Sequence, residues 1–168
     1  MILGMSTSTF TLVHVILSLI GIVTGLVVMF GFWSARILTF WNRIFLVTTI
    51  ATSATGFLFP FGGITPGIVV GIVSLVVLAL AIVALRRGWM KTYVITASLA
   101  EFLNVLVLIV QSFQKVPALH AYAPTGSEPV VKISQLVVLL LFIAVTVIAV
   151  RRQATASPVL KRFAAGAS

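Results

Sequence analysis

The chain has 168 residues, of which 61% are hydrophobic, and its formal charges are 11 Lys or Arg and 2 Glu. Charged residues make up 8% of the chain, compared with about a quarter in a soluble domain. The sequence has no Cys and no Asp. Their absence excludes disulfides, thiolate nucleophiles, cysteine-ligated zinc, iron–sulfur clusters and sites built from paired aspartates. The composition indicates a polytopic helical membrane protein.

The high positive charge does not indicate nucleic-acid binding. The formal net charge is +9, but Lys and Arg lie at the ends of apolar segments, where they orient a protein in the membrane. As partners we expect membrane lipid and other membrane helices, including a second copy of this chain. We expect neither nucleic acid nor a cofactor.

The chain contains five apolar segments that are long enough to cross a membrane. Each has roughly 20 residues, the number that spans a ~30 Å hydrocarbon core at about 1.5 Å per residue. The segments cover residues 10–32, 41–59, 66–85, 92–113 and 133–150. We therefore predict an all-α fold with one transmembrane domain over residues 1–152 and five transmembrane helices. Residues 153–168 form a basic tail that we expect to be disordered and attracted to anionic headgroups.

The joint between the second and third segments carries no charge. Residues 59–67 read FPFGGITPG, and the two Pro and three Gly cannot continue a helix. We interpret the joint as a tight hairpin, with Pro66 in the first turn of the next helix. A re-entrant loop is the alternative.

The distribution of Lys and Arg predicts the orientation. With five helices, nine of these residues share one side: Arg36, Arg43, Arg86, Arg87, Lys91, Arg151, Arg152, Lys161 and Arg162. The other side receives Lys115 and Lys132. Because cytoplasmic loops carry the excess of positive charge, we expect the N-terminus outside and the C-terminus inside.

Two of the predicted helices carry stripes of small residues. The stripes are Ser18, Gly21 and Gly25 in residues 10–32, and Gly67, Gly71 and Ser74 in residues 66–85. Small residues about four positions apart let two helices approach closely. We expect these stripes either to pack inside the bundle or to bind other membrane helices.

The segment 92–113 places its strongest polar side chains on one face. At about 100° per residue, Glu101, Asn104, Gln111 and Lys115 share an arc of about 80°. The arc must face protein or water, because a carboxylate facing lipid costs several kcal/mol. Glu101 lies about 14 Å from the cytoplasmic end, close to the midplane of the membrane.

Hydroxyl groups of the segment 41–59 reach the same depth as Glu101. No Lys or Arg does so, and we therefore expect Glu101 to take up a proton and to face the bundle interior. Its expected partner is a Thr or Ser hydroxyl of residues 41–59 or a backbone carbonyl. These polar residues either line a path through the membrane or serve as interhelical contacts. The path would comprise Glu101, Asn104, Gln111, Thr49, Thr52 and Ser53.

Two His residues offer a further candidate site. His14 lies about 6 Å below the outer surface and His120 lies in the outer loop. Two His can ligate haem iron or begin a metal site. The alternative is a His14 that is hydrogen-bonded to a neighbour. Counting depths predicts no contact between His14 and Glu101; a partner in residues 92–113 would be Asn104 or Gln111.

The sequence carries no enzyme signature. The patterns H-E-x-x-H, G-x-S-x-G and G-x-G-x-x-G and the Walker lysine motif are absent. Without Asp, a Ser-His-acid triad or a two-metal site has almost no residues to build from. We therefore expect no catalysis and assign no catalytic residue.

Three stretches resemble a group of small, uncharacterised bacterial integral membrane proteins. They are FTLVHVILSLIGIVTGLVV, TTIATSATGFLFPF and NVLVLIVQSFQKVPAL with the following APTGSEP. The resemblance covers residues 10–152. It implies a location in the bacterial cytoplasmic membrane and transfers no functional residue, because the group has no assigned activity.

The sequence leaves three function hypotheses. The leading one is a non-enzymatic inner-membrane protein that acts as an accessory, assembly or oligomeric component and docks helices through its small-residue stripes. The second is a small proton-coupled or polar-solute permeation protein that uses the polar face around Glu101. The third is a haem- or quinone-binding membrane redox subunit that uses His14.

Overall fold

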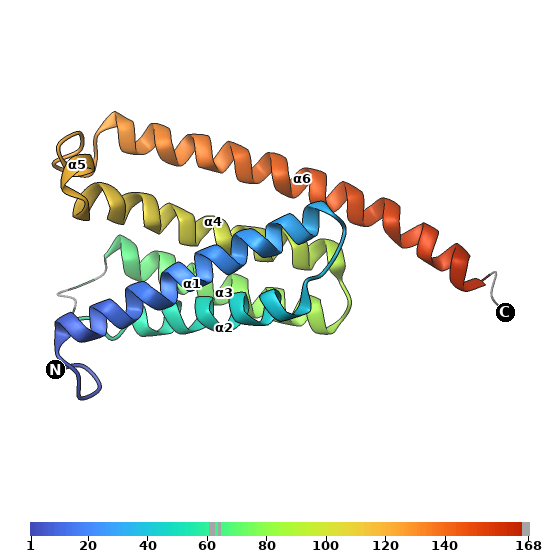
Figure 1. Ribbon diagram of the computed structural model, residues 1–168, viewed down its shortest axis with the longest axis horizontal. Coiled ribbons are helices and arrows are strands. Elements are labelled where there is room, and N and C mark those ends of the chain that lie inside the picture. The colour runs from blue at the N-terminus through green and yellow to red at the C-terminus, as the bar shows by residue number, and fades with distance from the viewer. Residues whose placement is uncertain (61–62, 64, 166–168) are drawn as a thin grey trace.

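The computed structural model describes residues 1–60, 63 and 65–165, with side chains described as far as Gln153. Within these ranges the chain is built from α-helices (Figure 1), which confirms the predicted all-α class. The helices are α1 Thr7–Trp33, α2 Thr39–Gly56, α3 Pro66–Arg86, α4 Met90–Lys115, α5 Pro117–His120 and α6 Pro129–Ala165.

Local signals set where two of the helices begin. Ser6 Oγ accepts a hydrogen bond from the Thr9 N–H at the start of α1. Thr65 Oγ1 accepts one from the Ile68 N–H at the start of α3. Such caps satisfy N–H groups that have no partner within the helix. Pro66 occupies the first turn of α3, as predicted, where its missing N–H leaves no bond unmade.

Helix α4 lies at the centre of the arrangement and packs against α1, α3, α5 and α6 (Figure 1). Helices α1 and α2 form a closely packed antiparallel pair, α3 contacts both α2 and α4, and α6 lies on the outer side of α4. The N-terminus, α5 and the start of α6 share one end of the bundle, which we call the N-terminal face. The α1–α2 and α3–α4 connections lie at the opposite face, and α6 extends beyond it.

The main hydrophobic core lies toward the opposite face. Its largest fully buried side chains are Val28, Phe32, Phe45, Leu78, Tyr93 and Val94. A smaller cluster of Phe113, Ala123 and Val131 lies toward the N-terminal face, where α4 and the start of α6 meet the connection between them. The part of the bundle between these two clusters contains Glu101 and most of the buried hydroxyl groups.

Four helices in the described part of the chain are long and apolar enough to cross a membrane: α1, α3, α4 and residues Pro129–Gln153 of α6. They indicate a multi-pass membrane protein. Helix α2 falls outside this group. It has 18 residues, among them Asn42, Arg43 and a run of Thr and Ser, which lower its hydropathy. Five spans are thus not shown, although α2 lies in the bundle alongside α1 (Figure 1).

The boundaries differ most from the prediction at α6. This helix begins at Pro129 rather than residue 133, and it continues to Ala165 rather than ending at residue 150. Lys132 therefore lies within its first turns. The disordered state expected for residues 153–168 stays a prediction. Residues 61, 62 and 64 of the joint lie outside the described residues, and so does the choice between hairpin and re-entrant loop.

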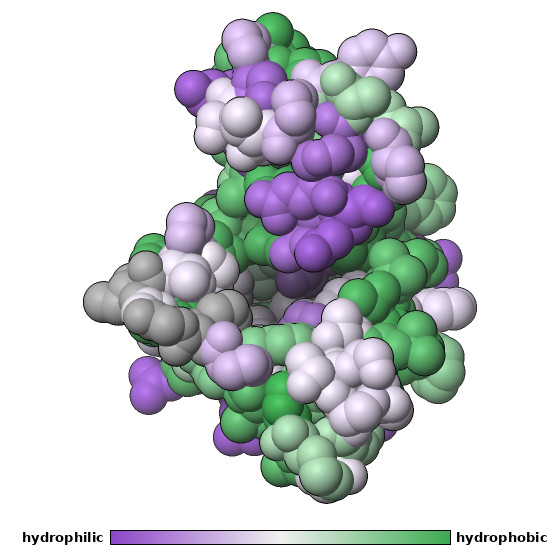
Figure 2. Space-filling model, turned by 90° about the vertical axis from the view of Figure 1, so that its left-hand side faces the viewer, coloured by the Kyte–Doolittle hydropathy of each residue, from purple (hydrophilic) through white to green (hydrophobic). Residues whose placement is uncertain are grey.

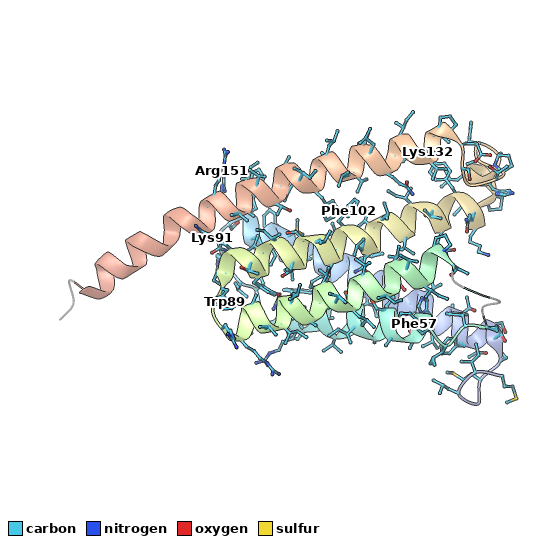
Figure 3. All side chains as sticks on the ribbon, turned by 180° about the vertical axis from the view of Figure 1, so that it is seen from behind. Phe57, Trp89, Lys91, Phe102, Lys132 and Arg151 are labelled. Carbon is cyan, nitrogen blue, oxygen red and sulfur yellow. The ribbon has the colours of Figure 1, made fainter. Side chains whose placement is uncertain are left out.

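The labelled Lys and Arg side chains lie toward the two ends of the bundle (Figure 3). Trp89, Lys91 and Arg151 lie toward the opposite face, whereas Lys132 lies near the N-terminal face (Figure 3). At the opposite face α6 is fixed to the end of α1. Arg152 Nη1 donates a 2.8 Å hydrogen bond to the Trp33 carbonyl, and its guanidinium lies 4.8 Å from the centroid of the Trp33 ring.

Candidate intramembrane polar site

The small residues of α1 pack against other helices of the same bundle. A Cβ at Gly21 would lie 3.3 Å from Thr49 Oγ1 and 3.4 Å from Thr48 Oγ1, and a Cβ at Gly25 would overlap the carboxyl group of Glu101. Ser18 Oγ donates to the His14 carbonyl of its own helix at 2.7 Å. The idea that other membrane helices dock on this stripe is wrong at Gly21 and Gly25, because α2 and α4 already occupy the space beside them.

The stripe of α3 also faces its own chain in part. A Cβ at Gly71 would lie 3.0 Å from Cζ of Phe57, and Ser74 is buried. Gly67 is exposed and lies near the cap residue Thr65. Gly71 thus gives room to the aromatic ring that follows α2.

Glu101 is fully buried, with 0% of its surface exposed. Asn104 lies one turn further along α4, and its Nδ2 donates to Glu101 Oε2 at 3.3 Å and to Thr49 Oγ1 at 3.2 Å. Glu101 Oε1 is buried and has no hydrogen-bond partner among the described residues. The predicted inward orientation is confirmed. Neither expected partner, an α2 hydroxyl or a backbone carbonyl, bonds the carboxyl directly within the described residues; the two donors of the Asn104 amide instead bridge the carboxyl and the Thr49 hydroxyl.

The hydroxyls of α2 fall into two kinds. Thr48 and Thr55 donate at 2.7 Å to the carbonyls of Ile44 and Ala51 one turn earlier, which satisfies them within their own helix. Thr49 accepts from α4, and Thr52 Oγ1 is buried with no partner among the described residues. Ser53 is also buried. The hydroxyls of Thr49 and Thr52 are therefore available to a neighbour other than their own helix.

His14 pairs with α2 rather than with α4. Its Nδ1 lies 2.9 Å from Thr55 Oγ1, and its ring packs edge-on against Phe59. With the Thr55 hydroxyl donating to the Ala51 carbonyl, His14 in its Nδ1–H tautomer donates to Thr55; in the other tautomer, Nδ1 accepts from the Thr55 hydroxyl. As predicted from depth, the hydrogen bonds that the described residues make include none between His14 and Glu101.

The structure gives no support to a metal site at the His residues. Within the described residues, no group of three or more His, Cys, Asp or Glu is arranged to hold a metal ion. His120 is exposed on α5, which packs against α4, whereas His14 lies between α1 and α2.

The predicted polar face of α4 divides into two parts. Glu101 is buried and Asn104 half-buried, whereas Gln111 and Lys115 are exposed toward the N-terminal face. Figure 2 shows this face end-on, with hydrophilic side chains gathered beside a hollow. Gln111 therefore lies outside the buried group of polar side chains, and the path expected along α4 stays a prediction. Buried polar groups continue instead toward α2 at Thr49.

The side of Glu101 toward the opposite face is closed by contacts that sequence reasoning missed. The Tyr93 hydroxyl of α4 donates to Asn42 Oδ1 of α2, and both residues are buried. Ser98 Oγ lies 3.1 Å from the Met29 sulfur. The main hydrophobic core surrounds these two contacts. Asn42 in a first helical turn was the available signal, since a buried amide needs a partner.

Comparison with protein-family models, with curated proteins and with solved structures found no match to this chain. The chemistry of the site is therefore argued from its geometry. A buried carboxyl group with one oxygen unpartnered, an amide bridge and two available hydroxyls can bind and release a proton, and they can hydrogen-bond a small polar molecule.

Proposed function

We propose that this protein is a non-enzymatic, five-span protein of the bacterial cytoplasmic membrane that binds and releases a proton at Glu101 while a small polar solute permeates. The observation that carries the proposal is the complete burial of Glu101 with Oε1 unpartnered. An acidic group at this depth is costly unless it is protonated or used. Asn104 and Thr49 supply the polar contacts that make protonation reversible.

The five-span topology has support from two observations. Helix α2 lies antiparallel to α1 in the bundle (Figure 1), and Thr48, Thr49 and Thr55 contact α1 or α4. Arg36, Arg86, Arg87, Lys91, Arg151 and Arg152 lie toward the opposite face, whereas Lys115 and Lys132 lie toward the N-terminal face; by the positive-inside rule the opposite face is cytoplasmic. Reporters inserted at Ala35 and at Gly63 should fall on opposite sides of the membrane. Finding both on one side would reject α2 as a span.

Proton flux in liposomes tests the proposed function. The purified protein is reconstituted, a pH gradient is imposed, and internal pH is followed with a dye. We expect Glu101→Gln to keep the fold and abolish proton-linked flux, because the amide keeps a donor and an acceptor but cannot release a proton. Glu128→Gln is the matched control, since Glu128 lies outside the long helices, in the connection before α6, where its Oε1 accepts a hydrogen bond from the Thr125 N–H. Equal flux in wild type and Glu101→Gln would overturn the proposal.

A second candidate function is the accessory or assembly role, in which membrane helices of a larger complex dock on the bundle. Helix α6 favours it, because only 6% of its most apolar stretch is buried against the rest of the chain. The occupant would be an apolar helix of a second copy, tested by cross-linking through Leu140→Cys in membranes. No observation favours the haem- or quinone-binding role, and we do not propose it.

A further inference from the structure

We propose that a groove between α1 and α6 binds a phospholipid with a net negative headgroup, with an acyl chain in the groove and the phosphate against Arg152. We call it the α1–α6 groove, and it is lined by Met29, Phe30 and Trp33 of α1 and by Val145 of α6. The proposal does not depend on the role of Glu101. It assigns a ligand of a different class to the outer surface of the bundle.

The α1–α6 groove contains open space. Its volume is about 290 Å³, several times the ~30 Å³ that a water molecule takes up in the liquid. Met29 is buried at its base, whereas Phe30 and Trp33 have 71% and 38% of their surface exposed. The groove is therefore open on its outer side and has room for several methylene groups of an acyl chain.

The course of α6 explains why the groove exists. Helix α6 packs along α4 and makes fewer contacts with α1. Helices α1 and α6 meet near the opposite face and diverge toward the N-terminal face (Figure 1). Ala149 is fully buried, whereas Val145, one turn earlier in α6, is only partly buried. The groove thus begins where the two helices separate.

The side chains of the groove favour hydrocarbon over water. A buried water needs several polar partners, and the indole N–H of Trp33 is the one strong donor among the lining side chains. In a membrane the open side of the groove faces acyl chains. A chain that enters the groove gains dispersion contacts, which an empty groove lacks. We therefore infer that a lipid of the surrounding bilayer occupies it.

Positive charge at the end of the groove selects the headgroup. Arg152 Nη1 donates to the Trp33 carbonyl, and its guanidinium lies 4.8 Å from the centroid of the Trp33 ring. These contacts hold the cation beside the groove. A guanidinium has several N–H donors, which match the oxygens of a phosphate group. Exposed Arg36 lies beside the last turn of α1, because its backbone N–H donates to the Gly31 carbonyl at 2.9 Å.

The depth of the groove fits a phospholipid whose headgroup lies at the opposite face. Val145 lies about two helical turns, roughly 10 Å, before Arg152, so the apolar groove lies directly below the cation. Glu101 is buried, and Glu128 lies near the N-terminal face, so neither acid offsets the positive charge at this end. Anionic lipids are attracted to such basic sites on the cytoplasmic side of a membrane. A net negative headgroup is therefore favoured over a zwitterionic one.

Quenching of Trp33 fluorescence by brominated lipids tests the site. Trp41→Phe and Trp89→Phe together leave Trp33 as the only Trp of the chain. This variant is reconstituted in phosphatidylcholine vesicles that contain a minor fraction of either phosphatidylglycerol or phosphatidylcholine with brominated acyl chains. Bromine quenches an indole that it contacts. We expect Trp33 to bind brominated phosphatidylglycerol about fivefold more strongly than brominated phosphatidylcholine.

Trp89 is the matched control. It also pairs with an arginine, since the Arg87 guanidinium lies 5.2 Å from the centroid of its ring. Trp89 lies toward the same end of the bundle, on the α3–α4 connection, and does not line the groove (Figure 3). With Trp33→Phe and Trp41→Phe in place, the two brominated lipids should quench Trp89 nearly equally.

Two results would overturn the proposal. The same preference for phosphatidylglycerol at Trp89 and at Trp33 would show only a general attraction of anionic lipid to the positive face. Absence of quenching of Trp33 by either lipid would show that the groove is covered by protein, such as a second copy of the chain.

Paired variants separate the contribution of the groove from that of the cation. Val145→Phe fills the groove and should abolish the preference at Trp33, whereas Val147→Phe adds the same ring at an exposed position of α6 outside the groove. Arg152→Gln should remove most of the preference. Arg151→Gln removes the same charge from a side chain that points away from the bundle (Figure 3) and should retain it.

The arginine pair keeps the proposal testable if Val145→Phe does not fold. Equal losses of the preference in Arg151→Gln and Arg152→Gln would overturn the assignment of the phosphate to Arg152. A preference that persists in a folded Val145→Phe variant would overturn the assignment of the acyl chain to the groove.

Discussion

The half of the bundle toward the opposite face and the half toward the N-terminal face are held together by different kinds of contact. Toward the opposite face, large side chains such as Phe32, Phe45 and Leu78 interlock with less than 2% of their surface exposed. Toward the N-terminal face, α1 meets α2 through Gly and hydroxyl residues, and the buried atoms Thr52 Oγ1 and Glu101 Oε1 have no hydrogen-bond partner among the described residues. The first arrangement resists rearrangement, because each atom has packing neighbours. The second leaves hydrogen bonds open, which is what a proton-binding site requires.

The largest difference between the halves should appear in their response to truncation. Phe45→Ala should lower the free energy of unfolding by about 3 kcal/mol, because it leaves a cavity among packed side chains. Thr52→Ala should cost less than about 1 kcal/mol, because its hydroxyl has no hydrogen-bond partner to lose among the described residues. Titration with a denaturing detergent, followed by circular dichroism, measures both. Equal costs would contradict the division into a packed and an open half.

Gly25 tests how closely the open half holds Glu101. Gly25→Ala should cost about 2 kcal/mol, because its Cβ would overlap the carboxyl group. In a Glu101→Ala background the same change should cost less than about 0.5 kcal/mol, because the overlapping atoms are gone. The coupling energy comes from unfolding titrations of the four proteins of the cycle. A coupling energy near zero between Gly25→Ala and Glu101→Ala would show that the Glu101 carboxyl group does not lie against Gly25.

Tyr93 tests the closed side of Glu101. Tyr93→Phe removes the donor to Asn42 and leaves a buried amide oxygen without it, which should cost about 1 kcal/mol. Tyr122→Phe is the control, since Tyr122 is 74% exposed in the connection between α4 and α6. Thermal unfolding in detergent should show a lower Tm for Tyr93→Phe alone. An equal decrease of Tm in both variants would show that the Tyr93–Asn42 hydrogen bond does not contribute to stability.

The smallest changes in stability are expected for two Thr→Val variants of α2, of which only one should change function. Thr52→Val and Thr48→Val each replace a hydroxyl by a methyl group and should alter stability by less than about 0.5 kcal/mol. Proton flux should fall only in Thr52→Val, because the Thr48 hydroxyl is donated back to Ile44 of its own helix. A fall of the same size in both variants would argue against a role for the free hydroxyl.

Periodicity and depth predicted much of the site. The 100° rotation per residue placed Glu101 and Asn104 on one inward face, and the count of residues separated the levels of Glu101 and His14. Both results hold in the structure. These quantities depend only on the geometry of a single helix. Pro66 at the start of α3 was predictable as well, because the Pro- and Gly-rich joint cannot continue a helix and proline suits the first turn of the next one.

Contacts that depend on the register of several helices were not predictable in this way. The overlap of Gly25 with Glu101 requires the relative height of α1 and α4, and the Asn104 bridge requires α2 as well. Gln111 shares the arc of Glu101 yet is exposed, because rotation about a helix does not tell where its neighbours end. By mean hydropathy α2 is not grouped with the four helices that are apolar enough to cross a membrane, although α2 packs among them.

The attachment of α6 to α1 has a mechanical consequence. Trp33 ends α1, where a backbone carbonyl has no partner within the helix, and Arg152 supplies that partner while lying against the Trp33 ring. Sliding α6 along its own axis would break both contacts. A pull on the part of α6 beyond Arg152 is therefore transmitted to the last turns of α1, and along that helix to Gly25 beside Glu101. A change in the rate of amide hydrogen exchange in the last turn of α1 would reveal such a pull.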